Sequence, residues 1–452
     1  MRCGRRVILM GFLVATLSAC AGVGRGRKVL VLGAGVAGLA AARELAAEGF
    51  AVTLIEARDR VGGRVVTDKR WAGVPVDLGA SWIHGVTGNP IAEIAADHGI
   101  KLAPITNYDN KRVYGPDGVV VDADTLGSEV EALAAAVAGE QDRRRDAGEA
   151  DISLADFVAT RTGGLDEPAR RRLDYIVNSE YEHEYAADAE ALSLLWFDDG
   201  EEKDGGDALI PGGYGQIVDV LAADLHVELS QVVTAVEYGA DGVVIRTASG
   251  RTFAGEFAVI TLPLGVLKRG SVRFTPALPT AKTAAIARLG MGLLDKCYLR
   301  FEARFWGEGS ELLGHIDAAT KGRWAEFVDL TSVLGAPVLL AFNAGAHAET
   351  VAARSDAEVV ADVMAVLRSI FGAEVPEPQD VILTRWGEDP FAGGSYSSLA
   401  PGATPDDLEV LAAAVAGRLF FAGEATSGEY QGTVHGAYLS GARAAKEMID
   451  EL

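Results

Sequence analysis

One turn near the start of the chain most constrains its fold. The apolar segment 29–32 is followed by Gly33, Gly35 and Gly38 in a G-x-G-x-x-G pattern, and a helix is expected from about Val36. The first glycine permits a tight turn, the second lets the backbone approach a pyrophosphate, and the third lets the helix pack on the strand. Phosphates would then lie at a helix N-terminus, where free N–H groups and the helix dipole favour negative charge.

A second strand and an acidic residue complete the pattern. Segment 51–55 is apolar and leads to Glu56, where a carboxylate can hold the diol of a ribose. A G-x-G-x-x-G pattern by itself is weak evidence. Strand, glycines, helix, strand and acid in this order are specific, so we predict that the chain binds a dinucleotide.

A second pair of glycines follows the acid immediately. Arg58, Gly62, Gly63 and Arg64 form the sequence R-x-x-V-G-G-R, which resembles FAD-binding proteins of the glutathione-reductase-like superfamily. There a second backbone turn and an arginine meet the same pyrophosphate, a feature that nicotinamide-binding units do not usually carry. The resemblance implies FAD as the cofactor, with Arg58, Gly63 and Arg64 among its contacts. The alternative is an ordinary glycine-rich loop beside a charged surface.

The chain is strongly acidic. Its 452 residues carry a net charge of −23, which argues against nucleic-acid binding and suits a cationic small molecule, because negative fields concentrate cations. The same acidity is also consistent with solubility alone. A hydrophobic content of 49% with 54 glycines fits a compact α/β protein of two or three domains. Three cysteines give no disulfide framework, and we predict no metal site.

The N-terminal segment resembles an export signal. Arg2, Arg5 and Arg6 precede the apolar run 7–17, and small residues follow up to Cys20. Leu-Ser-Ala-Cys resembles a bacterial lipobox with Cys20 as the lipidated residue, and Arg5-Arg6 loosely resembles a twin-arginine signal. We therefore predict a protein exported to the bacterial periplasm or cell envelope, with Cys20 as its candidate membrane anchor. The alternative is a cytoplasmic protein whose start is misassigned.

Strand and helix patterns divide the chain into alternating blocks. Glycine-rich strand–turn–helix patterns occur near both ends, and mostly helical or mixed patterns lie between them. Segments 232–238, 242–247 and 252–253 alternate around turn signals at 239–242 and 249–250, which predicts a β-meander. Segment 296–301 also alternates, and we interpret the charged segment 198–207 as a solvated loop. We predict an α/β fold in which a discontinuous, Rossmann-like FAD-binding domain of the glutathione-reductase type encloses an α+β substrate domain with a mixed sheet. The expected boundaries are 1–27 for the signal segment and linker, 28–105, 207–270 and 396–452 for the FAD-binding domain, 106–206 for the helical part of the substrate domain, and 271–395 for its sheet.

Five further blocks follow one another in the order of a known family. They read D-L-G-A-S-W-I-H-G at 77–85, T-L-P-L-G-V-L-K at 261–268, K-x-Y-L-x-F-x-x-x-F-W at 296–306, W-x-x-D-P-x-x-x-G-S-Y-S at 386–397 and F-A-G-E-A-T-S-x-x-Y-x-G-T-V-H-G at 421–436. Together they resemble the flavin-containing amine oxidases, and within them the polyamine and spermine oxidases and the lysine-specific histone demethylases. The resemblance implies a substrate channel that ends at the flavin.

The reaction implied by this resemblance is oxidation of a C–H bond next to nitrogen by hydride transfer to the flavin. The reacting amine must be neutral, although an alkylamine in water has a pKa of about 10.4, like lysine, and a desolvated pocket favours the neutral form. By the resemblance Tyr396 forms one aromatic wall of this pocket. Thr433 stands where many members have a second aromatic residue, so the two-tyrosine cage of monoamine oxidases is incomplete here. Lys296 would reach flavin N5 through a water and assist hydrolysis of the product or reoxidation.

The resemblance also assigns further cofactor contacts. Trp386 would lie near the isoalloxazine, Glu424 would bond the ribityl chain, and Val233 would hold the adenine through its backbone. The N–H groups of Thr433 and Val434 would face the flavin pyrimidine. The first of the five blocks adds Gly79, Ala80, Ser81 and Trp82.

Three residues are candidates for substrate binding. His84 matches a histidine of the substrate tunnel in some polyamine oxidases, and Glu180 and Glu184 lie in the insert that forms the channel in relatives. Their carboxylates would pair with distal ammonium groups, although acidic clusters often only coat a helix; we interpret His183 as incidental. We predict a polyamine oxidase that uses O2 and water to form an aldehyde, an amine and H2O2. The alternatives are oxidation of another amine or of an L-amino acid, and a membrane-tethered flavin-binding interaction module.

Overall fold

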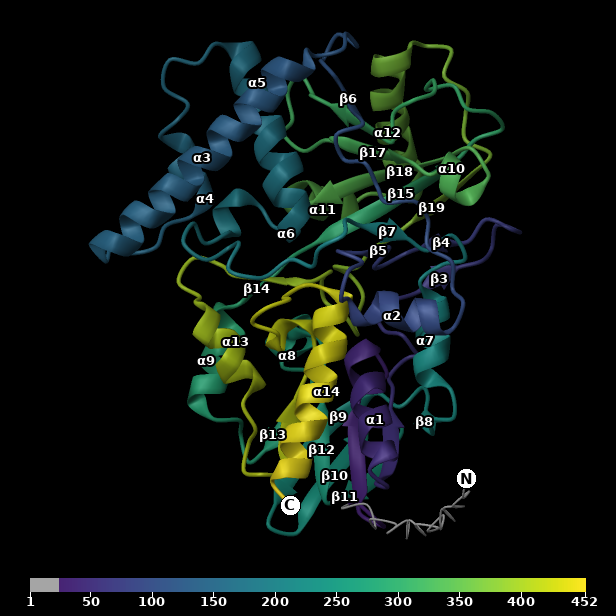
Figure 1. Cartoon of the computed structure of the whole chain (residues 1–452), viewed down its shortest axis with the longest axis vertical. Coiled ribbons are helices and arrows are strands. Elements are labelled where there is room, and N and C mark those ends of the chain that lie inside the picture. The colour runs from purple at the N-terminus through teal and green to yellow at the C-terminus, as the bar shows by residue number, and fades with distance from the viewer. Residues whose placement is uncertain (1–23) are drawn as a thin grey trace, which may run out of the picture.

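A five-stranded parallel sheet forms the lower half of the molecule in Figure 1, a computed structural model that describes residues 24–452. Its strand order is β21-β12-β1-β2-β8, and all four neighbouring pairs are parallel. The sheet therefore joins segments from the start, the middle and the end of the chain. Its strands are β1 (Lys28–Leu32), β2 (Ala51–Ile55), β8 (Val227–Glu228), β12 (Phe257–Ile260) and β21 (Leu419–Phe421).

Both faces of this sheet are covered, because its strands are apolar at successive positions. Val29 and Val31 of β1 pack with helices α1 (Val36–Ala47) and α14 (Val434–Asp450), which run side by side in Figure 1. An added Cβ at Gly441 of α14 would lie 2.1 Å from the carbonyl oxygen of Ala37, so the two helices are in backbone contact. Leu30 and Leu32 face the other way, into a core shared with a four-stranded sheet.

The four-stranded sheet contains the predicted β-meander. Strands β9 (Val233–Gly239), β10 (Gly242–Thr247) and β11 (Thr252–Gly255) pair antiparallel in sequence order, and β13 (Arg273–Thr275) adds to β9 in parallel. The strands are separated at 239–242 (Gly-Ala-Asp-Gly) and 249–250 (Ser-Gly), where these turn residues predicted it.

A six-stranded mixed sheet forms the upper half. Its order is β19-β15-β18-β17-β16-β6, with β16 and β6 the parallel pair. The alternating pattern of β15 predicted one buried face, but residues 295–299 are all buried. Cys297 and Leu299 pack toward helix α12, whereas Tyr298 packs with segment 71–76 on the opposite face. The strands are β6 (Lys111–Tyr114), β15 (Leu294–Arg300), β16 (Leu312–His315), β17 (Glu326–Asp329), β18 (Val338–Ala344) and β19 (Asp380–Leu383), and α12 is Asp356–Phe371.

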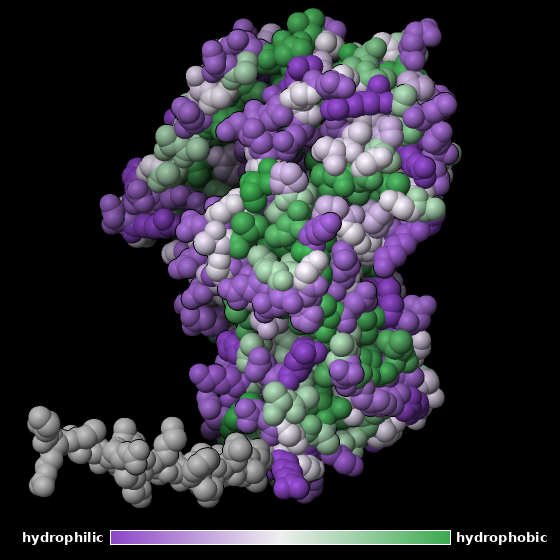
Figure 2. Space-filling model, turned by 45° about the vertical axis from the view of Figure 1, so that its right-hand side comes forward, coloured by the Kyte–Doolittle hydropathy of each residue, from purple (hydrophilic) through white to green (hydrophobic). Residues whose placement is uncertain are grey.

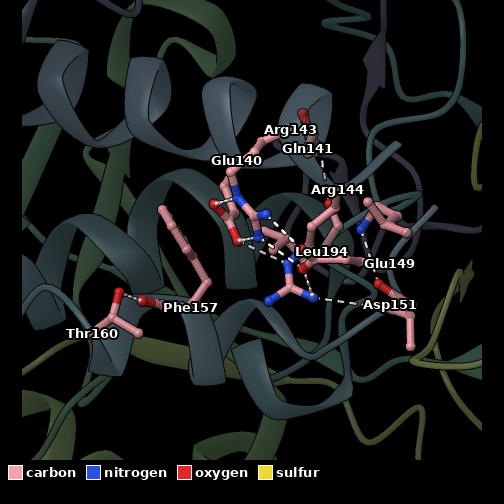
Figure 3. Close-up of polar contacts among 11 residues, drawn as sticks. Glu140, Gln141, Arg143, Arg144, Glu149, Asp151, Phe157, Thr160 and Leu194 are labelled. Atoms are coloured by element: carbon pink, nitrogen blue, oxygen red, sulfur yellow. Dashed lines mark hydrogen bonds and ion pairs between the residues drawn. The ribbon is translucent and has the colours of Figure 1, made fainter. Parts of the chain in front are cut away.

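A helical segment packs beside the upper sheet. It consists of α3 (Ala123–Ala147), α4 (Leu154–Ala159), α5 (Glu167–Val177), a π-helical turn (Asn178–Glu182) and α6 (His183–Tyr185). Figure 3 shows how the C-terminal end of α3 is fastened: Gln141 Nε2 donates to the carbonyl oxygen of Leu194 at 2.9 Å, and Arg144 donates to Glu140 and to the carbonyl oxygen of Ala150.

The remaining elements are short. The helices are α2 (Pro90–Asp97), α7 (Gly215–Ala222), α8 (Leu264–Arg269), α9 (Thr280–Arg288), α10 (Thr331–Leu334), α11 (Gly345–Ala352), α13 (Pro405–Ala412) and the 3₁₀ turns Ala189–Ala191 and Glu424–Thr426. The strands are β3 (Thr67–Asp68), β4 (Val76–Asp77), β5 (Trp82–Ile83), β7 (Ala208–Leu209), β14 (Gly290–Met291) and β20 (Ser397–Ser398).

The structure is therefore α/β with several sheets, as predicted. Hydrophilic side chains cover much of the face shown in Figure 2, with hydrophobic side chains between them. Among residues 24–452 we find no helix long and apolar enough to cross a membrane. The predicted domain boundaries stay a prediction.

Lys282 is a buried cation that joins three elements of the lower half. Its Nζ donates to the carbonyl oxygens of Val410, Leu411 and Ala413 at the end of α13, and lies 3.9 Å from the ring centre of Phe421 on β21. These carbonyls lie at a helix C-terminus, where few other donors can reach them.

We expect Lys282→Met to lower the free energy of unfolding by about 3 kcal/mol, because it leaves buried carbonyls without a donor. Urea denaturation followed by near-ultraviolet circular dichroism measures this change. Lys446→Met is the matched control, since Lys446 is exposed on α14. Equal stability of the two variants would contradict the role given to Lys282.

Candidate functional site

The turn between β1 and α1 is open on the side where a phosphate would bind. Gly33 has a φ of +100°, which favours glycine. An added Cβ at Gly38 would lie 1.9 Å from the carbonyl oxygen of Gly33, so strand and helix need glycine for their close contact. An added Cβ at Gly35 meets no atom of residues 24–452 within 4 Å. The three glycines thus differ in their surroundings, and the space at Gly35 would suit a phosphate group; their roles in cofactor binding stay a prediction.

Glu56 fixes the surroundings of this turn. Its buried carboxylate accepts hydrogen bonds from the N–H groups of Ala34 and Arg58, both at 2.8 Å. The carbonyl oxygen of Glu56 accepts from the N–H of Gln231, which brings the segment before Val233 alongside. Gly63 lies against Gly35, since its added Cβ would be 3.4 Å from the Gly35 Cα. The two glycine turns therefore contact each other, and the segment that leads to Val233 lies beside Glu56.

Arg64 and Glu424 form an ion pair at the end of the parallel sheet. Arg64 Nη1 lies 2.9 Å from Glu424 Oε1 and also donates to the carbonyl oxygen of Ser395 at 2.8 Å. Glu424 Oε2 accepts from Ser397 Oγ at 2.6 Å and from the N–H of Gly432 at 3.2 Å. A cavity beside the pair is lined by Arg64, Glu424 and the segment 260–264. The arginine and carboxylate assigned to the cofactor thus border a small cavity.

Arg58 is engaged at the other side of the glycine turns. Its guanidinium makes two hydrogen bonds of 2.8 Å to the carboxylate of Asp389. This bidentate pair joins the first glycine-rich unit to the block 386–397, more than 300 residues away in sequence.

Strand β15 places Lys296 against the segment 77–81. Its buried Nζ donates to the carbonyl oxygens of Asp77 and Gly79 at 3.1 and 2.6 Å, and to Ser81 Oγ at 2.5 Å. The hydroxyl of Tyr298 donates to the same Asp77 oxygen at 2.6 Å. Burial lowers the pKa of Lys296 to about 8, and the Asp77 carboxylate opposes this shift. The amine is thus held in place by the block that the sequence assigned to the flavin.

Trp386 is held in the same region by two contacts. Its indole Nε1 donates to the carbonyl oxygen of Leu78 at 2.8 Å, and its backbone N–H donates to Asp295 Oδ1 at 2.9 Å. An added Cβ at Gly79 would lie 3.2 Å from the ring of Trp386, so the indole packs directly on the 77–81 segment. The N–H of Ala80 donates to the carbonyl oxygen of Arg64, which connects this segment to the glycine turns.

Aromatic side chains lie around Lys296. Phe342 pairs with Lys296 across β15 and β18, and its ring centre is 5.9 Å from Nζ. The ring centres of Trp82 and Phe342 are 6.2 Å apart. Tyr396 donates from its hydroxyl to the carbonyl oxygen of His183 at 2.8 Å. The sequence predicted Trp82 and Tyr396 at the site but not Phe342, since a phenylalanine in an apolar strand carries no functional signal.

Helix α14 begins beside Tyr396. Thr433 is its N-cap and accepts a hydrogen bond from the N–H of Gly436 at 2.9 Å, and Val434 is its first residue. An added Cβ at the neighbouring Gly432 would lie 3.4 Å from the Tyr396 ring. The helix N-terminus and the tyrosine are therefore adjacent, and their places at the flavin stay a prediction.

His84 belongs to a partly exposed acidic cluster. Its Nδ1 lies 2.8 Å from Asp207 Oδ2, and Asp207 also accepts from the N–H of Gly85 and the hydroxyl of Tyr108. Desolvation by the surrounding side chains lowers the pKa of His84, but the hydrogen bond with Asp207 outweighs this and raises the pKa above its usual value. The charges of Glu184 and Glu202 add to the increase. Asp207 itself was not predicted, because it ends a charged loop that looked merely solvated.

Glu180 is paired within the protein. Its Oε1 lies 3.4 Å from Lys111 Nζ, which also lies 2.7 Å from Glu326 Oε1. Glu326 in turn contacts Nδ1 of His183 at 2.9 Å. Of the two predicted glutamates, Glu184 thus lies in the His84 cluster, whereas Glu180 faces a lysine.

Comparison with known proteins places the chain in one family. The family model described as flavin containing amine oxidoreductase matches residues 36–449. The chain belongs to this family. Family membership confirms the predicted enzyme class, flavin-dependent amine oxidase, and FAD as its cofactor.

Two kinds of plant relatives match most of the chain. Lysine-specific histone demethylase 1 homolog 3 of Oryza sativa subsp. japonica is 38% identical over 94% of this chain and 54% of its own length. Polyamine oxidase 4 of the same plant is 37% identical over 93% of this chain and 88% of its own length. Polyamine oxidase 2 of Arabidopsis thaliana is 37% identical over 94% of this chain and 88% of its own length. This flavin amine oxidoreductase thus spans about half the length of the demethylase homologues that it matches.

The predicted localisation was wrong. These relatives are plant polyamine oxidases and histone demethylase homologues, not exported lipoproteins, so the comparison gives no support to export or to a membrane-tethered module. The residues on which that prediction relied, including Cys20, lie outside the described residues. Basic, apolar and small residues in succession are a generic pattern, which is why the interpretation failed.

Proposed function

We propose that this flavin amine oxidoreductase oxidises a polyamine at a carbon next to nitrogen and passes the electrons to O2. Water then hydrolyses the oxidised C–N bond, so the products from the polyamine, O2 and water are an aldehyde, an amine and H2O2. The observation that carries the proposal is the Asp207 carboxylate, 2.8 Å from Nδ1 of the partly exposed His84; the charges of Glu184 and Glu202 act on the same histidine, and together these acids can attract a second ammonium group. A monoamine has no group for this cluster to bind.

The lower half of the molecule supplies the cofactor site in this proposal. The cradle at Gly35, the Glu56 carboxylate and the Arg64–Glu424 pair would hold FAD between the parallel sheet and the block 386–397. When bound, FAD accepts the hydride and returns the electrons to O2. The family resemblance and the shared position of these groups support a glutathione-reductase-like FAD domain.

The chain's own residues prepare the amine for oxidation. Tyr396, Trp82 and Phe342 form apolar walls near Lys296, and such walls favour the neutral form of an amine by excluding water. Lys296 would orient a water or move a proton at its Nζ, since burial lowers its pKa toward neutrality. This chain is 37% identical to two polyamine oxidases and covers 88% of the length of each. This coverage favours a small amine over a histone tail as substrate.

Anaerobic mixing with amines tests the proposal directly. Spermine, spermidine, N-acetylated polyamines, benzylamine and common L-amino acids are each added while the flavin absorbance is followed. Rapid loss of the absorbance with a polyamine, and H2O2 formation when air is admitted, is the expected result. If only a monoamine or an amino acid reduces the flavin, that compound class is the substrate and the polyamine proposal is wrong. If none of these compounds reduces the flavin, the oxidase proposal is contradicted.

We expect Asp207→Asn to raise the Kd for spermidine about 5-fold, because a partly exposed charge pair contributes up to about 1 kcal/mol. Binding of benzylamine should not change. Flavin reduction rates at a series of amine concentrations give both constants. Asp204→Asn is the control: it removes an exposed carboxylate from the same loop without touching His84. The same weakening in both variants would show a general charge effect and exclude a specific site.

A further inference from the structure

His183 is a buried histidine with an unused ring nitrogen. The residue is 7% exposed, and its Nδ1 lies 2.9 Å from Glu326 Oε2. Its Nε2 has no hydrogen-bond partner among residues 24–452. A buried polar atom normally has a partner, so this nitrogen calls for one that the folded chain does not supply.

Strand register places this imidazole beside the candidate site. Lys296 pairs with Phe342 across β15 and β18, and Phe327 pairs with Ala341 across β17 and β18. The same antiparallel register sets Glu326 next to Phe342, and directly opposed residues share one face of a sheet. Glu326, Phe342 and Lys296 therefore form a row, and the ring of His183 lies over it, 6.1 Å from the ring centre of Phe342.

Two further contacts fix the position of His183. Its carbonyl oxygen accepts the hydrogen bond from Tyr396, which ties it to the aromatic wall. It follows directly on the π-helical turn Asn178–Glu182, a local widening of the helix that is frequent at functional sites. The imidazole thus has a fixed place between Glu326 and the walls around Lys296.

The hydrogen bond with Glu326 sets which ring nitrogen of His183 carries the hydrogen. Burial opposes ionisation, but the nearby Lys111 ammonium and the hydrogen bond from His183 lower the pKa of Glu326 to about 2. An ionised carboxylate only accepts hydrogen bonds, so Nδ1 of His183 carries the hydrogen. Lys111 Nζ contacts the other oxygen of Glu326 at 2.7 Å, so Oε2 is left to accept from Nδ1 of His183, and we consider the tautomer with its hydrogen on Nδ1. In that form Nε2 presents a lone pair.

We propose that Nε2 of His183 accepts a hydrogen bond from an ammonium N–H of the substrate and thereby selects amines with a second, unacylated nitrogen. This inference rests on the proposed amine oxidation. The Phe342 ring lies between His183 and Lys296, so the nitrogen at His183 is the next one along the substrate and not the reacting one. Phe342 and Tyr396 suit the alkylene chain that joins the two nitrogens. Glu326 is the positioning residue that fixes the tautomer.

The test compares His183→Leu with His183→Gln in the full FAD-loaded protein, using spermidine and benzylamine in anaerobic stopped-flow mixing. We expect His183→Leu to raise the Kd for spermidine about 10- to 100-fold, the effect of losing a hydrogen bond to a charged group. The limiting rate of flavin reduction and the Kd for benzylamine should change less than about 3-fold. His183→Gln should restore most of the affinity, because its amide oxygen accepts a hydrogen bond.

His315→Leu is the matched control for packing. His315 is 3% exposed, and its Nδ1 has no hydrogen-bond partner in the described part of the chain, but the register of β16 puts it on the opposite face of the sheet from Glu326. FAD content and circular dichroism show whether each variant folds. If His315→Leu weakens spermidine binding as much as His183→Leu, the effect is structural and the inference is overturned.

Three results separate this inference from the proposed function. Reduction of the wild-type protein by spermidine, with an unchanged Kd in His183→Leu, would overturn the role of His183 alone. A loss of affinity confined to N-acetylated spermidine would show that Nε2 donates, which also overturns it. Failure of every amine to reduce the wild-type flavin would remove the oxidase proposal and this inference together.

Discussion

In a Lys296→Met variant we expect FAD to remain bound while flavin reduction or reoxidation slows at least about 100-fold. Positioned acid–base groups typically contribute 10²–10⁴-fold, and Lys296 is a buried amine on the row that faces the 77–81 segment. Methionine keeps the length of the side chain but cannot donate or carry a proton. Stopped-flow measurement of the two half-reactions identifies which of them uses the amine.

The pH dependence of the affected half-reaction tests the same residue. Burial lowers the pKa of Lys296 to about 8, so the protonated fraction falls as the pH rises through this value. A step that uses the ammonium form should slow above pH 8, and a step that uses the neutral amine should accelerate. Either titration should be missing in Lys296→Met.

Tyr298→Phe is the control for lost hydrogen bonding. The hydroxyl of Tyr298 donates to the same Asp77 oxygen as Lys296, so replacing Tyr298 by phenylalanine disturbs the 77–81 segment without removing the amine. We expect its half-reactions to stay within about 5-fold of wild type. Rates in Lys296→Met that match those of Tyr298→Phe would remove Lys296 from the mechanism.

A Gly35→Val variant should fold normally and lose FAD. The backbone at Gly35 is extended, with φ −75° and ψ 178°, which valine adopts freely, and within the described part of the chain an added Cβ there meets no atom within 4 Å. The side chain would instead fill the space that a pyrophosphate needs. We expect the Kd for FAD to rise at least about 100-fold while the free energy of unfolding of the apoprotein changes by less than about 1 kcal/mol. Flavin absorbance after gel filtration and urea denaturation measure the two quantities.

Gly38→Ala should behave in the opposite way. Its Cβ would lie 1.9 Å from the carbonyl oxygen of Gly33, so strand and helix must separate and the apoprotein itself is destabilised. The contrast between the two glycines distinguishes a ligand cradle from a packing contact. Full FAD binding by Gly35→Val would show that the cofactor does not approach this turn.

Local patterns determined much of the fold and the cofactor class. The β1–α1 glycine turn, Glu56 at the end of β2 and the β9–β11 meander occur where short-range spacing predicted them, because turn and strand geometry depend on neighbouring residues. The pattern of β15 predicted a half-exposed strand, but only the packing of α12 and of segment 71–76 on its two faces decided that both are buried.

The sequence by itself determined the α/β class, the glycine-rich turns, the family and FAD, since these depend on motifs that keep a fixed order along the chain. Only the tertiary structure decided the partners of those motifs. The Glu326–Phe342–Lys296 row depends on cross-strand register, and the His84–Asp207 and His183–Glu326 pairs join residues more than 100 positions apart. The burial of His183 could not be predicted from the sequence, because distant strands of the upper sheet cover it, and Asp207 ends a loop that is mostly exposed in the structure as well.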